Sequence, residues 1–363
     1  MRTFLFPALC AGLSLCFAAA CSSNSGSGAS GSGATSSGSG GQSTCPGDLA
    51  AAPGSDFCTW DSSTIDCALV SPSDREQVCG VPLPSPTTAL TRSTSVMEFA
   101  GSGPPDLGCF QASGYPTAGT SAMVTMSGVA KIFAHGCAST GLTIEVHTVN
   151  ADASIGALVG TAVTTPATCT TNSVAVTDTN CGTIYECNYT YPDVPSETQL
   201  IVLTKGAMWA PLYDYNNYIP TADVKAGVWT HDVRALASDD YGAIAQSALG
   251  APITAGNGAI AGEVHDCGDV RLIGATADTD VARKQLTYFT SDESDPLPNS
   301  SATATTALGL YAALDIAPGP ATVAALGLVG GQVTTLGYVK VQVYPDSVTS
   351  LTFNGVKPYQ LKP

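Results

Sequence analysis

The cysteines constrain the fold of this chain more than any other feature of its sequence. Thirteen are present, and ten of them lie between residues 45 and 267. An even set of this kind is typical of structural disulfides. Cys267 is the only cysteine after Cys187, so if all ten are oxidised it must pair upstream or with another chain. We therefore predict a covalent tie between distant modules, formed within the set Cys45, Cys58, Cys67, Cys79, Cys109, Cys137, Cys169, Cys181, Cys187 and Cys267.

The N-terminus reads as an export signal. Arg2 precedes an apolar stretch, which leads to three alanines and Cys21. A cysteine in this position resembles the lipobox of bacterial lipoproteins, where it is diacylated and becomes the new N-terminus. The resemblance implies that Cys21 is lipidated and anchors the chain in the cell envelope, and the following serine is compatible with onward transport to an outer membrane. Ordinary cleavage after Ala20 is the alternative, and it would leave one free thiol.

The charge balance narrows the range of partners. Acidic residues outnumber basic ones by 29 to 13, and the formal net charge is −16. Nucleic acid and anionic lipid surfaces are therefore poor partners. Charged residues make up only 12% of the chain, and the abundance of small and β-branched residues suits twisted sheets with many turns. We expect a mainly β fold, and no later segment has an uninterrupted apolar run of about 20 residues that could span a bilayer.

Strand patterns divide the chain into modules. Residues 121–134, 142–149 and 199–204 have the apolar patterns of strands, and residues 338–344 with 348–353 predict a terminal β-hairpin. Near-helical spacing predicts a short connector helix within 221–251. The expected organisation is 1–21 signal peptide, 22–44 Ser/Gly-rich tether, 45–92 Cys-rich module, 93–220 first β-sandwich, 221–251 helical connector and 252–363 second β-sandwich.

An internal repeat links the two halves of the chain. Residues 128–137 and 258–267 share Gly, His and Cys at the same offsets. The second half also contains Ile260-Ala-Gly-Glu-Val264, Gly274-Ala-Thr-Ala277, Gly309-Leu-Tyr311, Ile316-Ala-Pro-Gly319 and Ala321-Thr-Val-Ala-Ala325. These motifs resemble the transthyretin-like, or carboxypeptidase-regulatory-like, β-sandwich family, and the layout is similar to lipoproteins of predatory or soil δ-proteobacteria. The resemblance implies two tandem sandwiches with accessory or surface roles and specifies no chemistry.

Aromatic and polar residues gather in one segment. Flat rings beside amides and carboxylates suit saccharides or a protein hot spot. The alternative is that these rings pack the two sandwiches against each other. The candidate ligand-binding residues are Trp209, Tyr213, Asp214, Tyr215, Asn217, Tyr218 and Trp229.

Metal sites are weaker candidates, and we expect no cofactor. His135 with Cys137, and His265 with Cys267, could hold a soft metal, but an oxidising compartment would consume each cysteine in a disulfide. Acidic loops are weak calcium candidates, although simple solvation is the more economical explanation. The residues concerned are Asp278, Asp280, Asp292, Glu293 and Asp295.

The sequence lacks the common catalytic motifs. It contains no G-x-S-x-G, no H-E-x-x-H and no P-loop. We therefore expect a non-enzymatic cell-surface lipoprotein that binds a polysaccharide or a partner protein. A purely structural spacer is the alternative. A hydrolase using His231 and Asp232 with a serine brought near by folding is a third hypothesis, supported only by their adjacency.

Overall fold

The computed structural model describes residues 50–51, 58–59, 85–96, 98–169, 183–292 and 296–360. They belong to one compact unit, Ser43–Pro363, and are mainly β, as the composition predicts. The export signal, Cys21 and the tether lie outside the described residues. Within the described part, no helix has the length and apolar character needed to cross a membrane.

The strands fall into two groups along the chain. The first group is β4 (Met123–Phe133), β5 (Thr143–Val149), β6 (Ile155–Thr164), β7 (Cys187–Pro195), β8 (Gln199–Gly206), β9 (Trp209–Tyr218), β10 (Val228–Thr230) and β11 (Val233–Ala237). The second is β12 (Gly258–Val264), β13 (Leu272–Ile273), β14 (Thr276–Thr279), β15 (Gln285–Phe289), β16 (Pro298–Asn299), β17 (Leu310–Ile316), β18 (Gly319–Val329), β19 (Gln332–Val343) and β20 (Val348–Phe353). The short strands β1 (Ala50–Ala51), β2 (Cys58–Thr59) and β3 (Thr91–Arg92) precede both groups.

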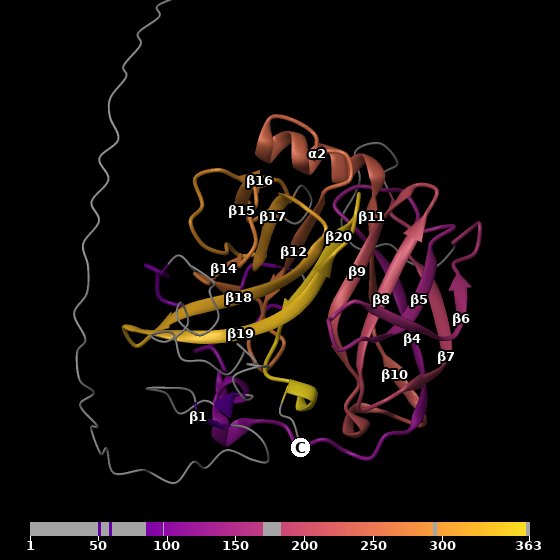
Figure 1. Ribbon diagram of the computed structural model, residues 1–363, viewed down its shortest axis with the longest axis horizontal. Coiled ribbons are helices and arrows are strands. Elements are labelled where there is room, and N and C mark those ends of the chain that lie inside the picture. Colours follow the sequence, from indigo (N-terminus) through magenta and orange to yellow (C-terminus); the bar gives the residue numbers. More distant parts are fainter. Residues whose placement is uncertain are drawn as a thin grey trace, which may run out of the picture. The chain divides into compact units, whose positions relative to one another are not determined.

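One sheet of thirteen described strands runs through both groups. Its central order is β4-β11-β9-β20-β12-β17-β15, and the two groups meet where β20 pairs in parallel with β9. Strands β9, β11 and β20 lie close together in Figure 1. β20 also pairs in parallel with β12 on its other side, so the last strand of the chain is an interior strand of this sheet.

Each group has its own apolar core. In the first, alternation buries Leu142, Ile144 and Val146 on one face of β5, as their spacing predicts. In the second, β12, β17 and β20 face a separate sheet of β14, β18 and β19 (Figure 1). Ile260 and Leu351 from one sheet pack in the same core as Val323 and Val341 from the other. Two sheets with a shared apolar core are the arrangement of a β-sandwich.

The two repeat segments have the same kinds of neighbours. β4 pairs in parallel with β11 and antiparallel with β7. β12 pairs in parallel with β20 and antiparallel with β17. At the start of each segment a glycine is required: a Cβ on Gly128 would lie 1.9 Å from the carbonyl oxygen of His231, and one on Gly258 would lie 2.4 Å from that of Tyr344.

The predicted terminal hairpin is wrong. β19 pairs with β18, whereas β20 pairs with β12 and β9. Residues 344–347 carry the chain from one sheet to the other instead of reversing it within one sheet. The alternating valines of β19 predict a strand with one buried face, but they carry no information about which neighbour its hydrogen bonds will find.

The helix expected within 221–251 is α2 (Ser238–Leu249). Asp239 and Asp240 lie in its first turn, where carboxylates interact favourably with the helix dipole. It ends at Gly250, whose φ of 69° is the left-handed conformation that closes many helices. The earlier part of that range forms β10 and β11 instead, because Val233 and Leu236 extend the sheet rather than continue the helix.

Two disulfides join cysteines of the described residues. Cys109 pairs with Cys267 across 158 residues, which gives Cys267 the upstream partner expected from its isolation. Cys169 pairs with Cys187 across 18 residues, and Cys137 is also disulfide-bonded. Cys45, Cys67, Cys79, Cys181 and the side chain of Cys58 lie outside the described part of the structure.

Candidate functional site

A cavity of about 570 Å³ opens over one face of the continuous sheet. Residues two apart on a strand share a face. The strands β9, β20, β12 and β17 are neighbours in the sheet, and their pairing registers align residues of this face in rows that run across all four strands. The central row runs from Asp214 on β9 to Ser350 on β20, Ala261 on β12 and Ala312 on β17. The floor consists of Leu212, Asp214, Val348, Ser350, Thr352, Ala259, Ala261, Glu263, Leu310, Ala312 and Leu314.

The cavity has an apolar end and a polar end. In the floor, Leu212, Val348 and Ala259 form one row, and they share a core cluster with Phe289 and Leu236. On the other side of Ser350 the floor carries the polar side chains of Thr352 and Glu263. A second set of lining residues, most of them polar, surrounds this end of the cavity. That set is Asn216, Asn217, Tyr218, Asp223, Trp229, His231, Asp232, Arg234, His265, Asp269, Asn354 and Lys357.

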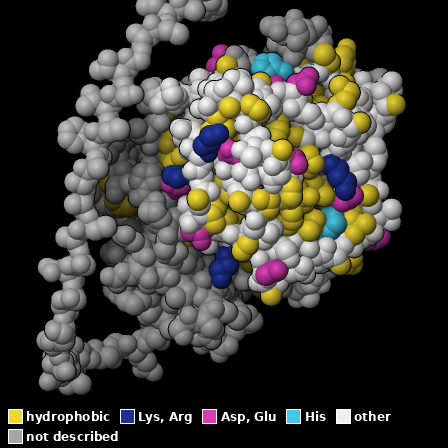
Figure 2. Space-filling view, turned by 45° about the horizontal axis from the view of Figure 1, so that its top comes forward, with side chains coloured by type: hydrophobic (Ala, Val, Ile, Leu, Met, Phe, Trp, Pro, Cys, Tyr) yellow, Lys and Arg dark blue, Asp and Glu magenta, His cyan; other side chains and the backbone are white. Residues whose placement is uncertain are grey.

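The molecular surface around these strands carries little charge. Figure 2 shows one face on which hydrophobic side chains gather centrally while charged side chains are few and scattered. Charged residues make up only 12% of the chain. The polar end of the cavity therefore has a higher proportion of titratable side chains than the chain as a whole.

The aromatic segment singled out in the sequence is divided between cavity and core. Asp214, Tyr215, Asn217, Tyr218 and Trp229 line the cavity. Trp209 and Tyr213 do not belong to this lining. The Trp209 indole packs in the core of the first group and donates a hydrogen bond to the Thr140 carbonyl at 3.0 Å. Tyr213 stacks on Tyr344 with 3.9 Å between ring centroids.

Asp214 is a half-buried carboxyl group in the cavity floor. It accepts hydrogen bonds from the Asn217 amide at 3.0 Å and from Ser350. Burial nevertheless raises the pKa of Asp214 to about 6, because these bonds do not replace the lost hydration of its charge. Near neutral pH this group changes charge easily.

A second acid of the floor is held firmly ionised. Glu263 contacts His265 at 2.7 Å and Arg271 at 3.0 Å. Burial alone would raise its pKa, but these two partners hold the pKa of Glu263 well below its usual range. Both ring nitrogens of His265 contact carboxylates, since Asp269 lies 2.7 Å from the other one. His265 therefore has no ring nitrogen left for a metal or a substrate.

His231 and Asp232 do not form a catalytic pair. The Asp232 carboxylate binds Lys131 at 2.9 Å and the backbone N–H of Val129 at 2.9 Å. The His231 ring stacks on Trp229 at 4.5 Å, and burial lowers its pKa to about 4. Its buried Nε2 has no hydrogen-bond partner among the residues that the structure describes. Without an acid to orient the imidazole, the triad arrangement required by the hydrolase hypothesis is incomplete.

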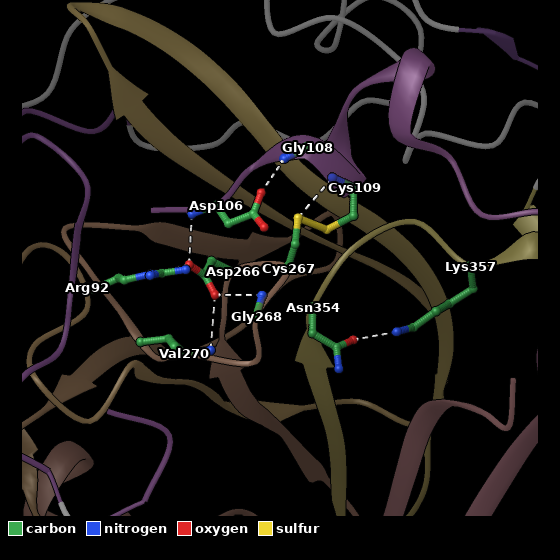
Figure 3. Close-up of a disulfide and its surroundings, with 10 residues drawn as sticks. All are labelled: Arg92, Asp106, Gly108, Cys109, Asp266, Cys267, Gly268, Val270, Asn354 and Lys357. Atoms are coloured by element: carbon green, nitrogen blue, oxygen red, sulfur yellow. Dashed lines mark hydrogen bonds and ion pairs between the residues drawn. A yellow bond between two sulfur atoms is a disulfide. The ribbon is translucent and has the colours of Figure 1, made fainter. Parts of the chain in front are cut away.

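Lys357 reaches the cavity from the segment after β20. Its ammonium group donates a hydrogen bond to Asn354 Oδ1 at 2.6 Å (Figure 3). Burial lowers the pKa of Lys357 to about 8, against the weaker opposing effect of Asp269 and Asp223. Among the described residues, no carboxylate lies within 4.0 Å of it. Sequence reasoning missed Lys357 and Asn354, which belong to no motif. It also missed Glu263 as a site residue, because the motif around Glu263 indicates a strand and specifies no chemistry.

The disulfide lies beside this segment. The backbone N–H of Val356 donates to the Cys109 carbonyl at 3.3 Å. Asp266, next to Cys267, accepts hydrogen bonds from Arg92 at 2.6 Å and from the Asp106 N–H at 2.8 Å (Figure 3). The Cys109–Cys267 bridge thus joins the loop after β12 to residues 108–110, and the Val356–Cys109 hydrogen bond attaches the segment that carries Lys357 to them.

The described residues contain no cluster of three or more His, Cys, Asp and Glu side chains suited to a metal. Asp278 pairs with Arg283, and Asp280 accepts the Thr322 N–H at 2.7 Å. Glu293 and Asp295 lie outside the described part, and Asp292 lies at its edge. His135 contacts Asp240 at 3.0 Å. In both His–Cys repeats the histidine therefore contacts a carboxylate and the cysteine is disulfide-bonded.

A scan against protein-family models matches no family, and a search of curated proteins finds no match.

Proposed function

We propose that this protein is a non-enzymatic envelope lipoprotein whose cavity binds a saccharide. The observation that supports it best is the cavity itself. A volume of about 570 Å³ lies within the range of small-ligand sites. Trp229 and Tyr218 line the same cavity as Asp214, Asn217, Ser350 and Thr352. Flat rings can cover the apolar face of a sugar, while amides and carboxylates bind its hydroxyls.

The anchor and the tandem modules form part of the same proposal. A lipid on Cys21 and the tether of residues 22–44 would hold the binding unit at a membrane surface, outer or inner. The matching neighbours of β4 and β12 support two copies of a transthyretin-like sandwich. Mass spectrometry of the mature N-terminus tests the anchor, since a diacylated Cys21 supports it and an unmodified Cys21 contradicts it.

A structural spacer is the second candidate function. It is favoured by the buried half of the aromatic segment, where Tyr215 donates to the Ala153 carbonyl at 2.8 Å and contacts the Tyr344 hydroxyl at 3.0 Å. These rings hold the two strand groups together. A spacer requires only this seam and makes no use of Trp229 or Asp214.

Retention of the purified mature protein on immobilised peptidoglycan, exopolysaccharide and outer-membrane protein separates these candidates. We expect retention on a polysaccharide fraction that is lost in Trp229→Ala and unchanged in Met208→Ala, whose side chain is exposed and does not line the cavity. Retention on the protein fraction alone would favour an assembly role. Equal retention of both variants would contradict binding in the cavity.

A further inference from the structure

Lys357 is an exception among the basic residues. The other Lys and Arg residues that the structure describes as buried or half-buried each have a carboxylate within 4.0 Å. Their pairs are Arg92–Asp266, Lys131–Glu98, Lys205–Glu145, Arg234–Glu98, Arg271–Glu263 and Arg283–Asp278. Acidic residues outnumber basic ones by 29 to 13, so a partner would be easy to supply. Within the described part of the chain, the Lys357 ammonium has only the Asn354 amide as a side-chain partner.

A buried ammonium group in this position lowers the stability of the fold unless a hydrogen-bond acceptor or a negative charge compensates it. Burying a charge without a partner opposes folding by several kcal/mol. An ammonium carries three N–H donors, and Asn354 accepts one of them. The remaining two belong to a side chain that lines the cavity. A ligand oxygen inside the cavity is the partner that the site lacks.

Two further polar groups of the cavity are unpartnered. His231 Nε2 and the Tyr241 hydroxyl are buried, line the same cavity and have no hydrogen-bond partner within the described residues. Both can donate a hydrogen bond to an oxygen acceptor. The cavity thus offers unused hydrogen-bond donors. Of its acids, Asp232, Glu263 and Asp269 contact Lys131, Arg271 and His265, respectively, and Asp214 accepts the Asn217 amide.

The charges limit the ligand to a single negative charge. Lys357 supplies one positive charge, while Asp223 and Asp269 lie near enough to affect its pKa. A doubly charged phosphate ester would meet these carboxylates with an unbalanced charge. A carboxylate neutralises one ammonium and accepts up to two of its donors.

We propose that the cavity recognises an acidic saccharide, a sugar bearing one carboxylate, and that the ammonium of Lys357 binds this carboxylate. The inference rests on the proposed saccharide-binding function. The Asn354 amide orients the ammonium, and the Cys109–Cys267 disulfide fixes the segment that carries both through the Val356–Cys109 hydrogen bond.

Matched sugar pairs test the proposal. The probes are methyl glucuronide with methyl glucoside and methyl galacturonide with methyl galactoside, titrated into the mature protein with Trp fluorescence and calorimetry as readouts. We expect at least one acidic sugar to bind ten-fold or more tightly than its neutral counterpart. Lys357→Met should abolish this preference, so that the acidic and neutral sugars of a pair bind equally, while Lys357→Arg should retain part of it.

Lys340→Met is the matched control, because Lys340 is exposed on β19 and its replacement should leave the preference intact. A thermal melt shows whether Lys357→Met is folded, and we expect a melting temperature no lower than that of the wild type. Neutral and acidic sugars binding equally would overturn the inference and leave the proposed function standing. Persistence of the preference in folded Lys357→Met would also overturn it, and no binding of any sugar in the panel would overturn both.

Discussion

Asp214 of β9 lies directly opposite Ser350 of β20, in the parallel pair that joins the two strand groups. The Ser350 hydroxyl and the Asn217 amide are the hydrogen-bond donors of a carboxyl group that burial keeps partly protonated. This raised pKa has a measurable consequence for stability.

Asp214→Asn should stabilise the protein at neutral pH and not in acid. The folded pKa is about 6 and the usual value is 3.8, so the wild type binds more protons when folded between these values. Its stability therefore falls as the pH rises through this window. The difference in free energy of unfolding should grow from near zero below pH 4 to about 1–3 kcal/mol above pH 6. Urea melts of both proteins from pH 3 to 8 measure it, and a constant difference would contradict the assignment.

Glu263→Gln should destabilise the fold strongly. The change leaves Arg271 and His265 without their shared carboxylate in a buried position, which typically costs about 3–5 kcal/mol. Glu145→Gln is the control: it also removes a carboxylate shared by a basic side chain and a histidine, Lys205 and His147, but the Lys205 side chain is 42% exposed. Ion pairs with exposed partners contribute about 0–1 kcal/mol. Equal effects in denaturant melts would show that the Glu263 cluster is not enclosed as described.

Gly262→Ala tests the close contact of β12 with β20. A Cβ at this position would lie 1.8 Å from the Leu351 carbonyl oxygen, and backbone cannot move aside cheaply. We expect a loss of about 2–4 kcal/mol in the free energy of unfolding, measured in urea. Gly242→Ala is the matched control: it lies in α2 with nothing within 4 Å, and it should stabilise by about 0.5–1 kcal/mol.

Removing the long disulfide should cost more than removing the short one. Loop-closure entropy predicts about 5 kcal/mol for Cys109–Cys267 and about 3 kcal/mol for Cys169–Cys187, from separations of 158 and 18 residues. Double Cys→Ser variants compared by thermal and chemical melts measure the two effects. A larger loss from the short bridge would show that local packing, and not loop closure, dominates.

The sequence predicted those parts of the fold that depend on local pattern. The alternation of Leu142, Ile144 and Val146 predicts strand β5. Gly250 predicts the end of α2, because glycine readily adopts the left-handed conformation that closes a helix. The partner of β20 could not be predicted, because the pairing of Asp214 with Ser350 joins residues far apart in the chain. Short-range patterns describe which face of a strand is buried and leave its neighbour undetermined.

The candidate site was partly predictable for the same reason. Asp214, Tyr218 and Trp229 attract notice because aromatic and polar residues crowd into one segment. Glu263 lies on β12 and Lys357 follows β20, so both join that segment only through the folded sheet. Lys357 differs from the other buried basic residues because no carboxylate of the described residues lies within 4.0 Å of its ammonium group. Only the folded structure shows this difference.

The interior place of β20 has a consequence for the order of events in the life of this protein. Its six residues are synthesised after those of β9 and β12, yet both strands need them as neighbours. The sheet therefore cannot close until residues 348–353 have been synthesised. Until they emerge, the chain has an open edge on β9 and another on β12. Such edges are sites for chaperones and for mispairing, and a ribosome that stalls before β20 would leave the cavity without the central strand of its floor.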